Sequence, residues 1–198
     1  MSLAQRLRRS WPLRGLLGFE ETIWTRKMSD AAVRILVEGL HPSMLSVLEI
    51  SGAVWKDYGF KSYRSASYPA FDICEAPLPQ TFDLVIAEHV FEHLLWPGRA
   101  GKHVRQMLAP GGHFLMVAPF MYRVHPDPQD CTRWTETGMK YFLAECGFPL
   151  DTIHTGSWGN RECIEASFRR EYTLFNRRVH SLENDPALPV VVWALAGR

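Results

Sequence analysis

The residues best suited to chemistry lie in one pentapeptide and in one loop downstream of it. His89-Val90-Phe91-Glu92-His93 places two imidazoles four residues apart, with a carboxylate between them. His125, Asp127 and Asp130 follow in a segment rich in proline. Imidazoles and carboxylates can take up and deliver protons near neutral pH. Both segments therefore predict acid–base chemistry, with metal binding as the alternative for the pentapeptide.

The pentapeptide matches the H-x-x-E-H pattern of a zinc peptidase family, in which both histidines lie on one face of a helix. A zinc hydrolase is thus an alternative function. Against it, the segment directly follows an apolar run typical of a buried strand, and no later acidic residue stands out as a third ligand. We expect no metal site, with His93 packed near a helix start and Glu92 facing solvent.

The loop from Phe120 to Arg133 is long for a compact domain, and loops of this length usually have a function. His125 is the preferred general base, because an imidazole flanked by aromatic and basic side chains could be brought over a substrate. Asp130 and His89 are the other catalytic candidates. In the alternative interpretation, Asp130 and Arg133 form a salt bridge that only holds the loop, and His125 is a turn residue.

The spacing of apolar residues predicts the elements that position these groups. A helix capped by Ser29 or Asp30 is followed by a strand that ends in the small residues Ser51-Gly52-Ala53, a turn through which a backbone can approach a ligand closely. The order of strand, helix, glycine turn and strand is typical of a parallel α/β sheet, whose last two strands could pair antiparallel at an edge. We expect strands over 46–50, 61–67, 82–87, 114–118, 150–155 and 190–195, and helices over 29–40, 98–108, 135–146 and 160–178.

The composition argues for an ordinary globular domain. The 198 residues are 46% hydrophobic and 22% charged with a formal net charge of +1, so overall charge points to neither a nucleic-acid nor a membrane partner. The four cysteines form no C-x-x-C pair, and no apolar run is long enough to span a bilayer. We therefore expect a cytoplasmic protein without integral membrane association.

The first 18 residues carry four arginines and no acid, interleaved with leucines. This pattern predicts an amphipathic helix interrupted at Pro12. It could be a lid or a membrane-surface contact, but a helix whose apolar side packs on the domain is the preferred interpretation.

Four motifs resemble, in order and spacing, those of the class I S-adenosylmethionine-dependent methyltransferases, especially small members of the type 11 group. They are Val47–Ala53, Asp72–Cys74, Phe82–Leu94 and Met107–Gly112. The resemblance implies an α/β fold: a Rossmann-like, doubly wound, mostly parallel seven-stranded sheet with an antiparallel edge strand and helices on both faces. The chain would be one domain, 1–198, with an N-terminal helical cap or lid over 1–43 and the Rossmann-like core over 44–198.

The resemblance also implies where S-adenosyl-L-methionine binds. The loop under its methionine and ribose would comprise Glu49, Ile50, Ser51, Gly52 and Ala53. Asp72 and Ile73 would border the adenine, and Glu88 and His89 the sulfonium. Two departures stand out: Ser51 and Ala53 replace common glycines, and Ser67 stands where the family has an acid for the ribose.

The implied function is methyl transfer from S-adenosyl-L-methionine to an oxygen or nitrogen of a small molecule, such as a sugar or a secondary metabolite, with S-adenosyl-L-homocysteine as product. A repurposed or non-catalytic member of the fold is the alternative, and a homodimer stays open. The expected acceptor-binding residues are Phe120, Tyr122, Arg133, Trp134, Trp158 and Arg161.

Overall fold

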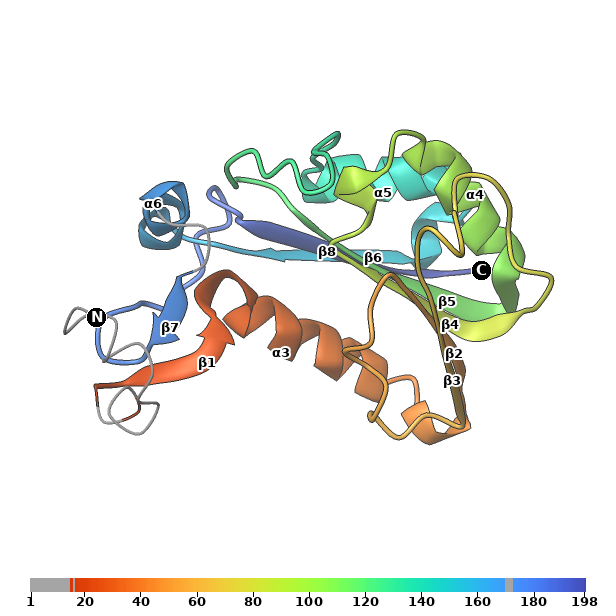
Figure 1. Ribbon diagram of the computed structural model, residues 1–198, viewed down its shortest axis with the longest axis horizontal. Coiled ribbons are helices and arrows are strands. Elements are labelled where there is room, and N and C mark those ends of the chain that lie inside the picture. Colours follow the sequence, from red (N-terminus) through yellow and green to blue (C-terminus); the bar gives the residue numbers. More distant parts are fainter. Residues whose placement is uncertain (1–14, 16, 170–172) are drawn as a thin grey trace.

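The structure is a computed structural model that describes residues 15, 17–169 and 173–198 (Figure 1). The predicted basic helix over the first 18 residues lies almost entirely outside this part of the chain. The described helices are α3 (Trp24–Glu38), α4 (Pro97–Met107), α5 (Glu136–Glu145) and α6 (Arg161–Arg169), with 3₁₀ turns η1 (Pro42–Met44), η2 (Phe91–His93) and η3 (Leu150–Thr152). The described strands are β1 (Phe19–Ile23), β2 (Ser46–Ile50), β3 (Ser62–Ala66), β4 (Phe82–Glu88), β5 (Leu108–Pro119), β6 (Ile153–Trp158), β7 (Leu174–Asn176) and β8 (Val191–Gly197).

Six strands form the main sheet in the order β3-β2-β4-β5-β8-β6. The first four run parallel, and β8 runs antiparallel between β5 and β6. The central strands are continuously apolar because both of their faces are covered, and Leu84, Val85 and Ile86 of β4 are all fully buried. Such an arrangement brings the carboxyl ends of β2, β3, β4 and β5 to one edge of the sheet.

Helices cover both faces of this sheet. Figure 1 shows α3 below it and α4 and α5 above it. Val33 and Val37 of α3 belong to one buried cluster, whereas Val104 of α4 and Leu143 of α5 belong to the other. The predicted α/β, doubly wound, mostly parallel class is therefore confirmed.

The number of strands and the place of the antiparallel strand differ from expectation. Within the described ranges the main sheet has six strands rather than seven, because residues 67–81 form turns and no strand. The antiparallel strand β8 lies inside the sheet, and β6 forms the edge. The reason is that Val192, Ala194 and Ala196 of β8 are completely buried, which needs a neighbour on each side.

The boundaries of two helices were predicted wrongly. Helix α3 begins at Trp24, so Ser29 is a buried residue inside it and not its cap. The helix starts there because β1 pairs with β7, and the Trp24 N–H donates to the Thr173 carbonyl at 2.8 Å. The helix expected over 160–178 ends as α6 at Arg169, and β7 follows.

Candidate active site

A large cleft of about 1110 Å³ opens at the carboxyl ends of the parallel strands. Loops after β2, β3 and β4 supply its walls, as expected for a ligand site in an open α/β sheet. From the predicted cofactor set it is lined by Ile50, Ser51, Ser67, Asp72, Ile73 and His89.

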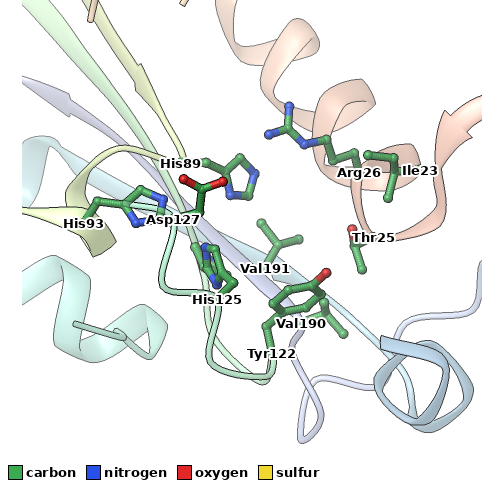
Figure 2. Close-up of a pocket in the computed structure, with 11 residues that line it drawn as sticks. Ile23, Thr25, Arg26, His89, His93, Tyr122, His125, Asp127, Val190 and Val191 are labelled. Carbon is green, nitrogen blue, oxygen red and sulfur yellow. The ribbon is translucent and has the colours of Figure 1, made fainter. Parts of the chain in front are cut away.

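A smaller cavity of about 240 Å³ adjoins it (Figure 2). Its wall combines the start of α3, the end of β4, the long loop and the segment before β8. The lining residues are Ile23, Thr25, Arg26, His89, His93, Pro119, Tyr122, His125, Asp127, Val190 and Val191. His89 and His93 line both cavities, so these two side chains mark the place where the cavities meet.

Glu49 does not line the cleft, but its buried side chain stabilises the loop after β2 through hydrogen bonds. Its carboxylate accepts hydrogen bonds from the backbone N–H groups of Val54 and Trp55, both at 3.0 Å, and from the Tyr63 hydroxyl at 2.6 Å. Burial, together with the Glu49 carboxylate, raises the pKa of Tyr63, so this hydroxyl stays a donor. A Cβ on Gly52 would lie 2.2 Å from Glu49 Oε1, so this position needs glycine.

The other predicted cofactor residues are placed as follows. Ser51 has a φ of +57°, the left-handed conformation that favours glycine, and its N–H donates to the Ala66 carbonyl. Asp72 Oδ1 accepts from the Cys74 N–H at 2.8 Å, which fixes the turn beside the cleft. Ser67 lines the cleft after β3, whereas Ala53 lines neither cavity.

The segment after β4 is bent sharply, and the long loop holds it. His89 has a φ of +54°, an unusual conformation for a residue with a side chain and one that clusters at functional sites. The Cys131 N–H donates to the Glu92 carbonyl at 2.7 Å, and Gln129 Nε2 donates to the His93 carbonyl at 2.8 Å. Since only Phe91–His93 is helical, as a short 3₁₀ turn, His89 and His93 do not share the helical face that the zinc peptidase pattern requires.

Glu92 is completely buried, so the prediction that it faces solvent is wrong. Three imidazoles surround its Oε1 atom: His89 Nδ1 at 3.5 Å, His93 Nε2 at 3.6 Å and His125 Nε2 at 4.0 Å. Sequence reasoning missed this convergence. The pentapeptide and the loop histidine lie far apart along the chain, and no local pattern indicates that they meet.

Asp130 and Arg133 form the predicted salt bridge, and the pair also orients His125. Asp130 Oδ2 accepts from the His125 backbone N–H at 2.9 Å and lies 3.4 Å from His125 Nδ1, while Arg133 Nη2 lies 3.3 Å from the same ring nitrogen. Burial acts to raise the pKa of Asp130, but hydrogen bonds from Arg133 and the His125 backbone outweigh it and the pKa is lowered. His125 therefore turns Nδ1 toward this pair and Nε2 toward Glu92.

Two groups at the end of β4 have shifted pKa values. Burial lowers the pKa of His89, although the neighbouring Glu92 carboxylate acts in the opposite direction. Burial, and then the nearby Asp30 carboxylate, raise the pKa of Glu88 to about 7. The site thus favours uncharged side chains at the strand end.

The shift at Glu88 predicts a pH-dependent stability. A carboxyl whose pKa rises on folding binds protons more tightly in the folded protein, so its ionisation destabilises the fold progressively from about pH 4.5 to pH 7. We expect Glu88→Gln to stabilise the protein at pH 8 by about 2 kcal/mol and to have little effect at pH 4.5. Urea unfolding at both pH values measures this. Equal effects at the two pH values would contradict it.

The predicted acceptor-binding residues separate into two groups. Tyr122 lines the smaller cavity, and Arg133 holds His125 there. The others line neither cavity: Trp134 packs on Phe142 with ring centroids 5.1 Å apart, Trp158 is buried, Phe120 packs against a core cluster and Arg161 is exposed. Thr25 and Arg26 were missed because the helix that carries them was predicted to begin later.

Comparison with known proteins agrees with the resemblance that the sequence motifs carry. Residues 39–116 match the family model described as a methyltransferase domain, a range that contains the loop after β2, the end of β4 and the whole of α4. The match covers less than half of the chain and agrees with the resemblance to the class I S-adenosylmethionine-dependent methyltransferases. The resemblance seen in the sequence motifs is therefore confirmed.

Solved structures of S-adenosylmethionine-dependent methyltransferases share the fold at low sequence identity. A methyltransferase from Archaeoglobus fulgidus has a TM-score of 0.58 and 13% identity, covering 96% of this chain and 100% of that one. The N-methyltransferase NodS from Bradyrhizobium japonicum, in complex with S-adenosyl-L-homocysteine, has a TM-score of 0.52 and 15% identity, covering 98% and 97%. No curated protein sequence matches significantly. These likenesses establish the methyltransferase fold and leave the acceptor to be argued from the site.

Proposed function

We propose that this protein transfers a methyl group from S-adenosyl-L-methionine to an oxygen or nitrogen atom of a small molecule. The observation that carries the proposal is that two cavities of different size meet at His89 and His93. A transferase needs two ligands whose reacting atoms come together at one point.

The larger cleft suits the cofactor. It lies beyond the carboxyl ends of the parallel strands, where nucleotide ligands bind in open α/β sheets. Ser51 and Ser67 would lie beside the ribose, and Asp72 and Ile73 beside the adenine. A cofactor bound in this way would have its sulfonium toward His89.

The smaller cavity suits the acceptor. Arg26, Tyr122 and Asp127 provide polar groups, while Ile23 and Val191 provide apolar surface (Figure 2). A volume of about 240 Å³ accommodates a molecule of modest size.

None of the helices within the described residues could span a membrane, given their length and hydropathy.

The chemistry is an in-line displacement, in which the acceptor atom attacks the methyl carbon and sulfur leaves as a neutral thioether. Much of the rate would come from holding the two reactants aligned. An acceptor that carries a proton also needs a base. We assign this role to His89, because it borders both cavities, whereas Asp130 and Arg133 turn the previously preferred His125 toward Glu92.

Calorimetric titration with S-adenosyl-L-methionine and S-adenosyl-L-homocysteine tests the cofactor part. We expect one molecule of either per chain, with binding weakened at least about tenfold in Asp72→Ala. A labelled methyl donor with a panel of small hydroxyl and amine acceptors then tests transfer. Absence of binding to both ligands would instead favour a repurposed fold, the alternative suggested by Ser67 in place of an acid.

A further inference from the structure

We propose that Glu92, His93 and His125 form a binding site for a divalent transition-metal ion at the junction of the two cavities. One ligand atom from each of these residues lies within 4.8 Å of the others. Two imidazoles and one carboxylate are the ligand set of many catalytic zinc sites and of facial-triad iron sites.

The buried carboxylate is the first argument. Glu92 has no solvent exposure, and neither of its side-chain oxygens accepts a hydrogen bond from any described residue. A carboxylate taken out of water without a partner is costly unless a cation balances it. The groups around Oε1 are imidazole nitrogens.

The orientation of His93 is the second argument. Its Nδ1 lies 2.5 Å from the Gln129 backbone carbonyl, which can only accept, so Nδ1 carries a proton and donates it. In a neutral ring Nε2 then presents a lone pair, and this atom lies 3.6 Å from Glu92 Oε1. Two acceptors that face each other repel unless a proton or a metal ion lies between them, and a metal ion meets that need.

The setting of His125 is the third argument. Its Nδ1 lies 3.4 Å from Asp130 Oδ2 and 3.3 Å from Arg133 Nη2, which leaves Nε2 turned toward Glu92 at 4.0 Å. A metal ion on Nε2 would put the ring proton on Nδ1, where Asp130 can accept it in place of the Arg133 contact. A carboxylate behind a histidine is the usual way in which proteins orient a metal-binding imidazole. Ligands about 2.1 Å from one ion lie roughly 3.0–3.6 Å apart. The 3.6 Å between Glu92 and His93 fits this range, whereas the 4.0 Å between Glu92 and His125 exceeds it and all three ligand atoms lie within 4.8 Å, so ring rotations would have to close the site.

The site differs from the zinc peptidase pattern. There, both histidines of the pentapeptide bind the metal and the glutamate acts as a base, whereas here Glu92 itself is a ligand. The second histidine, His125, comes from the long loop and lies near His93 (Figure 2). Three protein ligands leave coordination positions open toward the smaller cavity, which His93 and His125 line. If the proposed function holds, an acceptor oxygen or nitrogen would bind the ion there.

Metal binding to the full chain tests the site independently of methyl transfer. Bound metal is first removed from the protein with a chelator, and the protein is then titrated separately with Zn²⁺ and Co²⁺. Three quantities are measured: the heat of binding, the visible absorption of Co²⁺ and the melting temperature of the protein. We expect one ion per chain and a higher melting temperature with metal. Glu92→Gln and His125→Gln should each weaken binding at least about 100-fold, whereas His154→Ala, on the exposed face of β6, should not change it.

The stability of Glu92→Gln without metal separates the proposal from an ion pair. If an ion normally balances Glu92, the metal-free Gln variant should melt at a higher temperature than the metal-free wild type. A lower melting temperature, with no stoichiometric metal on the wild type, would mean that a protonated imidazole balances Glu92. That result would overturn the proposal. So would Zn²⁺ and Co²⁺ binding that is unchanged in both Glu92→Gln and His125→Gln. Neither result bears on whether S-adenosyl-L-methionine binds.

Discussion

Replacing His89 with asparagine is expected to slow methyl transfer by about 10²–10⁴-fold while leaving the affinity for S-adenosyl-L-homocysteine within about threefold of wild type. Asparagine tolerates the left-handed conformation that His89 adopts, with its φ of +54°, so the fold around the strand end should persist. The expected loss is chemical, because asparagine cannot accept the acceptor's proton.

The rate is measured with the acceptor found by the labelled-donor screen, and affinity is measured by calorimetry. His154→Ala is the matched control, since it removes an exposed imidazole remote from both cavities. A His89→Asn variant that transfers methyl groups at the wild-type rate would exclude His89 as the base. A loss of cofactor affinity equal to the loss of rate would make His89 a binding residue instead.

Glu49→Ala is expected to have the largest effect on stability, about 3 kcal/mol, and to abolish cofactor binding. The substitution leaves the N–H groups of Val54 and Trp55 and the Tyr63 hydroxyl without their shared acceptor, and each buried donor that loses its partner costs about 1–3 kcal/mol. The loop beneath the cofactor would then lose the contacts that shape it.

Urea unfolding measures the change, and Tyr63→Phe provides the graded control. Phenylalanine removes one of the three donors and keeps the ring, so we expect a loss of about 1 kcal/mol and cofactor binding that is retained. Should Glu49→Ala unfold at the wild-type urea concentration, the carboxylate would not be the organiser of this loop.

Local patterns predicted the elements whose signals lie within a few residues. The apolar run at β4 and the start of the helix α5 were both predicted correctly from the sequence. Thr135 caps this helix by accepting from the Gly138 N–H at 3.0 Å. The start of α3 was not, because pairing of β1 with β7 decides it and these strands are about 150 residues apart. Pairing between strands so far apart in the sequence cannot be predicted from the residues next to either strand.

In the same way, the parts of the candidate site that depend on local sequence could be predicted, and the parts that depend on distant contacts could not. The motif order identified the residues that line the larger cleft, since Ser51, Ser67 and Asp72 follow directly on strands or turns of recognisable pattern. The burial of Glu92 was not predictable, because the loop that covers it comes from residues 120–133 and is held by contacts such as Cys131 to Glu92. Arg26 reaches the smaller cavity for a similar reason, through the packing of α3 beneath the sheet.

The most direct test of the two-cavity account is a crystal structure with S-adenosyl-L-homocysteine. The account predicts the adenine beside Asp72 and Ile73, the ribose beside Ser51 and Ser67, and the sulfur atom at the junction bordered by His89 and His93. A bound product whose sulfur lies away from that junction, or whose adenine occupies the smaller cavity, would contradict it.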